Sequence, residues 1–73
     1  MTDAVWLRTG EAARALGVSR RTVSRRFDAG ELTGRTLRGL RWISGDSLLD
    51  YVEAHGTRSQ IAEVDDLIAR VRD

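Results

Sequence analysis

The chain has 73 residues, enough for one small domain, and its lack of cysteine and single histidine exclude disulfides, thiolate metal sites and histidine-rich metal centres. Its charge is segregated, because residues 19–43 carry seven arginines against two acids, whereas residues 44–73 carry three arginines against seven acids. This polarity indicates a polyanionic partner for the basic middle of the chain. No apolar run is long enough to span a membrane and the first residues lack the apolar core of a signal peptide, so we expect a cytoplasmic protein.

The first segments predict an apolar lead-in followed by a short helix. In the lead-in, residues 4–8, Trp6 and Leu7 are expected to pack on the domain. The segment TGEAARALG, residues 9–17, predicts a helix with Thr9 as its N-cap and the last glycine as its C-terminal stop. Its inward face would be formed by Ala12, Ala13 and Leu16.

A second helix is predicted over residues 20–29, with Ser19 as its N-cap. Its inward face would hold two apolar residues four positions apart, Val23 and Phe27. On a helical wheel, Arg21 and Arg25 then point away from the core. Two short helices joined by about three residues that include a glycine are typical of a helix-turn-helix.

Two β-prone runs, residues 33–37 and 40–43, flank an arginine–glycine pair and predict a β-hairpin. A hairpin alone is marginally stable in water, so this one must lean on the helices. We expect Leu37 and Trp42 to make that contact and Arg38 to lie at the tip.

Two further helices are predicted in the second half of the chain. The third would have Ser44 as N-cap and end at Gly56. Its inward face would be Leu48, Leu49 and Val52. The fourth opens with Thr57 and Gln60 in the spacing of a capping box. Its apolar stripe comprises Ile61, Val64, Leu67, Ile68 and Val71. This stripe would either mediate self-association or fold back on residues 44–56 and enlarge a small core.

The arginines of the second helix are placed unfavourably for an isolated helix. Arg20 and Arg21 lie at its positive N-terminal end, and Arg25 repels the arginine four positions before it. Each effect costs a few tenths of a kcal/mol to about 1 kcal/mol, which a few phosphate or guanine contacts would offset. A helix of this width fits the major groove of DNA. We therefore interpret the basic face as a DNA-binding surface rather than merely solvated charge.

The segments TGEAARALGVSRRTVSRRFDAGEL and RGLRWISGDSLLDYV resemble the winged helix-turn-helix of MerR-type regulators and of phage and plasmid excisionases. The resemblance implies a mainly α fold with a small β-hairpin wing and a C-terminal helix. It implies that the second helix meets the major groove, that Arg38 enters or straddles the minor groove and that Arg41 holds a phosphate. Where relatives often have an aromatic residue after the arginine matching Arg25, this chain has Arg26. The candidate DNA-binding residues are Ser19, Arg20, Arg21, Thr22, Ser24, Arg25, Arg26, Arg35, Arg38 and Arg41.

We therefore expect a winged helix-turn-helix DNA-binding domain over residues 1–56 and an amphipathic helix over residues 57–73. The leading hypothesis is sequence-specific binding of double-stranded DNA by an excisionase or a small MerR-like transcriptional regulator that binds cooperatively and bends DNA. Its expected partners are DNA, further copies of the chain and, for an excisionase, an integrase.

No serine, histidine and acid are spaced as a catalytic set, so we expect neither enzymatic activity nor a cofactor. The alternative hypothesis is a protein-interaction module that uses the last helix on a helix-turn-helix scaffold. Salt separates the two hypotheses, because DNA binding weakens steeply with salt and a hydrophobic contact does not.

Overall fold

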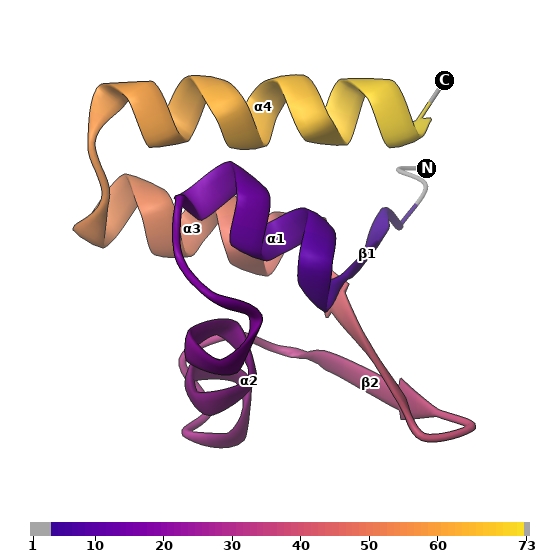
Figure 1. The fold of residues 1–73 in the computed structure, drawn as a ribbon. Helices are drawn as coiled ribbons and strands as arrows, with labels where there is room; N and C mark the ends of the chain where they lie inside the picture. The colour runs from indigo at the N-terminus through magenta and orange to yellow at the C-terminus, as the bar shows by residue number, and fades with distance from the viewer. Residues whose placement is uncertain (1–3, 73) are drawn as a thin grey trace.

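The computed structural model describes residues 4–72, which form four helices and a three-stranded antiparallel sheet (Figure 1). In chain order the elements are β1 (Trp6–Arg8), α1 (Thr9–Leu16), α2 (Arg20–Asp28), β2 (Gly34–Leu37), β3 (Leu40–Ser44), α3 (Gly45–His55) and α4 (Arg58–Arg72). The strand order is β1-β3-β2, so β3 lies between the other two strands. Helices α1 and α2 form the helix-turn-helix, and β2 and β3 form the hairpin wing. The predicted mainly α winged helix-turn-helix with a C-terminal helix is confirmed.

The serine N-caps of α2 and α3 are confirmed. Ser19 Oγ accepts a hydrogen bond from the backbone N–H of Thr22 at 3.1 Å. Ser44 Oγ accepts one from the backbone N–H of Ser47 at 3.3 Å. Each serine satisfies an N–H group that the first helical turn leaves without an intrahelical partner. Short-range chemistry thus fixes where these two helices begin.

The start of α1 differs from the prediction. Its N-cap is Arg8, and Thr9 is already the first helical residue. The Glu11 carboxylate accepts a hydrogen bond from the backbone N–H of Arg8 at 2.8 Å, which is the bond that the third helical residue makes to the N-cap in a capping box. At the other end Gly17 has a φ of 71°, a left-handed conformation that favours glycine, and its predicted role as the stop is confirmed.

The expected lead-in contains a β-strand. Strand β1 pairs antiparallel with β3, which brings Leu7 opposite Ile43. Both side chains are fully buried. Because successive strand residues point to opposite faces, Trp6 lies on the outer face of the sheet, where it is half-buried. The backbone N–H of Gly45 also donates to the Val5 carbonyl oxygen at 2.8 Å, which continues the contact beyond the strand.

The wing leans on the helices through a residue other than the two predicted ones. Ile43 is fully buried, whereas Leu37 is 55% exposed and Trp42 is half-buried. The alternation along β3 turns Ile43 toward the helices and Trp42 toward the outer face. Leu37 pairs with Leu40 beside the turn. The prediction that Leu37 and Trp42 make the core contact is therefore wrong.

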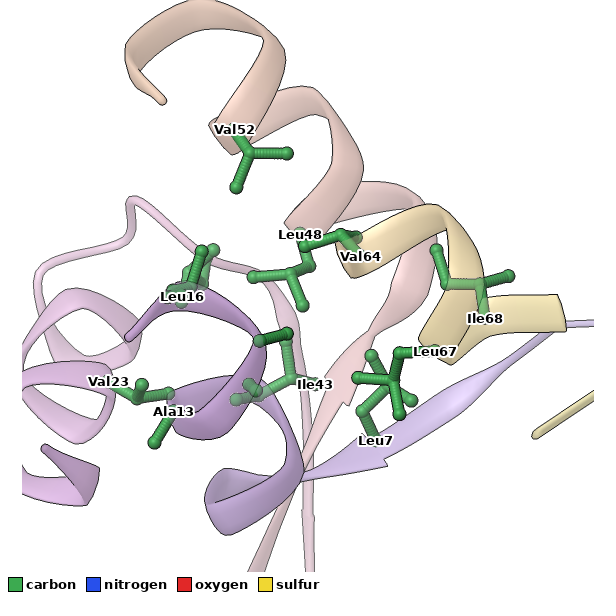
Figure 2. Packing of buried hydrophobic residues seen from close by; sticks show 13 residues of the cluster. Leu7, Ala13, Leu16, Val23, Ile43, Leu48, Val52, Val64, Leu67 and Ile68 are labelled. Atoms are coloured by element: carbon green, nitrogen blue, oxygen red, sulfur yellow. The ribbon is translucent and has the colours of Figure 1, made fainter. Parts of the chain in front are cut away.

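One apolar core joins the sheet to the helices, and Figure 2 shows its side chains converging from strands and helices far apart in sequence. Its buried residues are Leu7, Ala12, Ala13, Ala15, Leu16, Val23, Leu32, Ile43, Leu48, Val52, Val64, Leu67 and Ile68. At its margin pack the partly buried Val5, Phe27, Leu49, Tyr51 and Ile61. The inward faces predicted for the first three helices are confirmed, with Phe27 and Leu49 at the edge of the core rather than inside it.

Helix α4 folds back on the domain and packs against both α1 and α3 (Figure 1). Val64, Leu67 and Ile68 of the predicted self-association stripe are buried in the core, as Figure 2 shows, and Ile61 packs at its margin. Val71 is 40% exposed. The structure thus shows the back-folding alternative, with α1 as an additional neighbour. Buried side chains offer no surface to another copy, so the three core residues are unsuited to the self-association role given to them.

The predicted capping box at the start of α4 is confirmed. The backbone N–H of Thr57 donates to Gln60 Oε1 at 2.8 Å, and the backbone N–H of Gln60 donates to Thr57 Oγ1 at 3.2 Å. Gln60 Nε2 also donates to the Leu16 carbonyl oxygen at 2.8 Å. One side chain therefore caps α4 and ties it to the end of α1.

Candidate nucleic-acid interface

The basic middle of the chain occupies α2 and the wing, which project on the side of the molecule away from α4 (Figure 1). Helix α2 carries Arg20, Arg21, Arg25 and Arg26. The wing carries Arg35, Arg38 and Arg41. Folding thus brings all seven arginines of this segment to two neighbouring projections.

The outward face of α2 is built around Arg21 and Arg25. Val23 is fully buried against the core, while Arg21 and Arg25 are exposed, as the helical wheel predicts. Thr22 and Ser24 are half-buried at the edges of this face. Neither arginine forms an ion pair with any residue in the described range 4–72. Two guanidinium groups on one exposed face are therefore available for a ligand.

Arg20 lies against α1 rather than beside the other two arginines. A Cβ atom placed on Gly10 would come within 3.0 Å of Arg20 Nε, so the guanidinium packs close to the first turn of α1. Any larger residue at position 10 would compete with the guanidinium for this space. The structure thus places Arg20 where α1 and α2 approach each other, away from the outward face of α2.

An open cavity of about 430 Å³ lies between α1, the start of α2 and β3. Four of its lining side chains are arginines: Arg8, Arg14, Arg20 and Arg41. Glu11 is the one acid in the lining, and its carboxylate is engaged by the Arg8 backbone N–H. A cavity with several guanidinium groups suits a phosphate group, because guanidinium pairs with phosphate in a bidentate manner.

Two of the predicted DNA-binding arginines are held by acids of the same segment. Arg26 forms an ion pair with Glu31 at 3.3 Å, and Arg41 approaches both carboxylate oxygens of Asp28 at 3.4 Å. All four side chains are more than a third exposed, so each pair stabilises the fold by no more than about 1 kcal/mol. A phosphate could replace either carboxylate at small cost.

The outer face of the sheet carries two arginine–tryptophan stacks. The Arg35 guanidinium lies 4.6 Å from the ring centroid of Trp6, and the Arg8 guanidinium lies 5.1 Å from that of Trp42. Such stacks hold a guanidinium in place while leaving its charge available. Both tryptophans therefore position arginines instead of filling the core.

Sequence reasoning did not select Arg8 or Arg14 as site residues. Arg8 stands just before α1 and reaches its tryptophan only through the pairing of β1 with β3. Arg14 is on the exposed side of α1 and lines the cavity together with residues from other elements. No local pattern marks either residue, because their neighbours come from distant parts of the chain.

Arg38 occupies the tip of the wing, as predicted. It has a φ of 54° and Gly39 has one of 78°, so the turn consists of two consecutive left-handed residues. This geometry is the usual one for a two-residue β-hairpin turn, because it matches the twist of the strands. The turn exposes Arg38 between Leu37 and Leu40, which are paired across the two strands.

A family model of the helix-turn-helix domain matches residues 6–56, which span α1, α2, the wing and α3. The chain belongs to the helix-turn-helix domain family. This is a family of small excisionase-like and MerR-like DNA-binding domains, so the resemblance noted in the sequence is confirmed. No curated protein and no solved structure gives a significant match to the chain.

Membership makes this helix-turn-helix domain a DNA-binding domain, and the contacts of its individual arginines stay predictions.

The described residues contain no group of three or more side chains able to hold a metal ion. Within the same range, no helix has the length and apolar character needed to cross a membrane. His55, at the end of α3, packs its ring against Tyr51 with the centroids 5.2 Å apart.

Proposed function

We propose that the chain binds a specific sequence of double-stranded DNA and places α2 in the major groove. The observation that carries this proposal is the exposed pair Arg21 and Arg25, set opposite the buried Val23 on the second helix of a helix-turn-helix. In this fold the second helix is the one that contacts base edges. Arginine suits the role because its guanidinium donates two hydrogen bonds to guanine O6 and N7.

The remaining basic residues would hold the DNA backbone. The arginine-lined cavity beside Gly10 would receive a phosphate next to the major groove, with Arg20 as its central ligand. Arg38 would enter the minor groove from the wing, and Arg41 would exchange Asp28 for a phosphate. The proposed DNA-contacting residues are Arg8, Arg14, Ser19, Arg20, Arg21, Thr22, Ser24, Arg25, Arg26, Arg35, Arg38 and Arg41.

The biological role that fits this domain is that of an excisionase or a small MerR-like regulator. As an excisionase it would bind near attachment sites, bend the DNA and direct an integrase toward excision. As a regulator it would occupy a promoter. Cooperative binding of several copies would use charge complementarity, because α4 lies away from the basic projections and carries exposed acids, Glu63 and Asp65 among them.

The protein-interaction alternative needs an exposed apolar stripe on the last helix. Of the five residues assigned to it, three are buried in the core and Ile61 packs at the margin, which leaves only Val71 exposed. DNA binding is therefore the function that the geometry supports best.

The deciding experiment is selection of bound duplexes from a random DNA pool at about 0.15 M salt, where exposed charges are screened beyond about 8 Å. A sharp motif is expected. Motifs arranged as direct repeats would support cooperative assembly of copies along the DNA. A pool without any enriched sequence would contradict sequence-specific binding.

A further inference from the structure

We propose that Leu37 and Leu40 form an apolar wedge that enters the minor groove and unstacks a base step of bound DNA. The inference rests on the proposed duplex binding and adds two residues that carry no charge to the interface. It also gives the wing a role beyond holding the backbone, because an inserted side chain changes the path of the DNA.

The wedge consists of two leucines that the fold leaves in solvent. Leu37 is 55% exposed and Leu40 is 42% exposed, although every leucine of the core is at least 92% buried. The other large apolar side chains with comparable exposure in the described residues, Val18 and Val71, belong to other parts of the molecule. Single exposed leucines are common on protein surfaces, but two that stand together form a continuous apolar surface of the kind that marks an interaction site.

The backbone holds the two leucines as a unit. They are direct cross-strand partners in the β2–β3 register, so their side chains stand on the same face of the sheet. The two-residue turn through Arg38 and Gly39 sets the distance between the strands at this end. At the other end β3 is anchored by the buried Ile43. The wedge is thus carried by an ordered hairpin rather than by a flexible loop.

The charges around the wedge identify DNA as its occupant. Arg38 lies between the leucines in sequence. Arg35 lies on β2, two residues before Leu37, and Arg41 lies on β3, directly after Leu40. Figure 1 shows the tip projecting on the same side as α2, so one ligand can contact both. A leucine pair flanked by arginines matches the minor-groove binders that insert apolar wedges between base steps.

A second protein molecule is a poorer occupant for this surface. A stable protein interface buries about 800 Å² on each partner, far more than two leucine side chains expose at a hairpin tip. The three flanking arginines would also repel the basic wing of another copy. The minor groove, by contrast, supplies both negative potential and the apolar faces of unstacked bases.

The wedge predicts a feature of the target sequence. Pyrimidine–purine steps such as TA and CA/TG unstack more easily than other steps. A selected motif should therefore contain such a step beside the segment read by α2, at the position that the tip of the wing reaches.

The test compares the unchanged chain with the double variant Leu37→Thr/Leu40→Thr, in which threonine keeps β-propensity and removes the apolar ends. Val71→Thr is the control, since it makes the same kind of change at an exposed site on α4. Bending is measured by energy transfer between dyes at the two ends of a 30-base-pair duplex of about 100 Å. Unstacking is measured by the fluorescence of 2-aminopurine placed at successive positions of the same duplex.

We expect the unchanged chain and Val71→Thr to bend the duplex and to raise 2-aminopurine fluorescence at one step. The double variant should lose both signals. Its affinity should fall by about tenfold or less, because the cost of unstacking disappears together with the wedge contacts.

Three results would overturn the wedge. An unchanged chain that binds DNA without bending or unstacking it would remove the proposal and leave the proposed function intact. A double variant that retains both signals would do the same. If the unchanged chain fails to bind any duplex, the proposed function falls and the wedge falls with it.

Discussion

Arg25 and Arg41 differ in what the folded chain does with their guanidinium groups. Arg25 has no acidic partner in the described residues, whereas Arg41 lies 3.4 Å from both carboxylate oxygens of Asp28. A free guanidinium on the outward face of α2 is positioned to select a base. Arg41 must first leave Asp28, at the junction of α2 and the wing, and is positioned to hold the DNA backbone.

Arg25→Ala is expected to relax the preference for one base position and to cost about 1–3 kcal/mol of binding free energy on the selected duplex. The loss of binding free energy on a duplex of random sequence should be smaller. Arg41→Ala should weaken binding to both duplexes alike, because a phosphate contact carries no sequence information. Fluorescence anisotropy with both duplexes checks these outcomes, and equal losses on both duplexes for Arg25→Ala would contradict its assignment to a base. Arg70→Ala, on α4, is the control for a change of charge.

Asp28→Asn is expected to strengthen binding to every duplex. The substitution frees the Arg41 guanidinium and removes a negative charge next to the position expected for a DNA phosphate. The gain should be about 0.2–1 kcal/mol, the range of an exposed ion pair. Asp66→Asn is the matched control, because it breaks the Asp66–Arg70 pair of α4 with the same change of charge. An equal gain for both variants would assign the effect to net charge alone.

At the scale of the elements, local signals predicted the helices well. Ser19, Ser44 and the Thr57–Gln60 pair each act within three or four residues, so the helix starts that they set could be found in the sequence. Strand β1 could not be found in this way, because its three residues become a strand only by pairing with β3 far along the chain.

The candidate site was predictable to a similar degree. The outward direction of Arg21 and Arg25 follows from helical geometry and the position of Val23. The place of Arg20 beside Gly10, and the stacks on both tryptophans, depend on contacts between elements. The inward residue of the wing was also missed, since the face that a strand residue occupies is set by register in the assembled sheet.

Gly34→Ala is expected to disrupt the wing and leave the helices folded. A Cβ atom at position 34 would overlap the Trp42 carbonyl oxygen of β3, and forcing extra volume into a packed region costs about 1–3 kcal/mol. Thermal unfolding should show the loss of stability, and affinity for all duplexes should fall because the wing arginines are displaced. Thr36→Ala, at an exposed position of the same strand, should leave both measurements nearly unchanged.

At the scale of the whole molecule, the charge segregation of the sequence becomes a segregation in space. The arginine-rich α2 and wing project on one side, and α4, which belongs to the acidic end of the chain, lies on the other (Figure 1). The net charge of +1 therefore conceals a dipolar molecule. Such a distribution orients the basic side toward DNA during approach and keeps the acidic side away from the phosphates.

This geometry predicts a steep dependence of binding on salt. Each neutralised phosphate contributes about −0.9 to the slope of log K against log salt, so roughly four phosphate contacts would give a slope near −3.6. Titrations of a fixed duplex at several salt concentrations measure the slope. If the cavity beside Gly10 holds a phosphate, Arg20→Ala should reduce the magnitude of the slope by about 0.9, the contribution of one phosphate. A slope near zero for the unchanged chain would contradict an electrostatic interface.

Strand β2 lies at an edge of the sheet, since the order is β1-β3-β2, and all four of its residues are exposed. An open edge offers unpaired backbone groups to strands from other molecules, which is a common route to aggregation. Arg35 on this strand and Arg38 beside it place positive charge along the edge, and like charges on approaching molecules repel. The arginines assigned to DNA thus also protect the free protein, so neutralising them to tune affinity would lower its solubility as well.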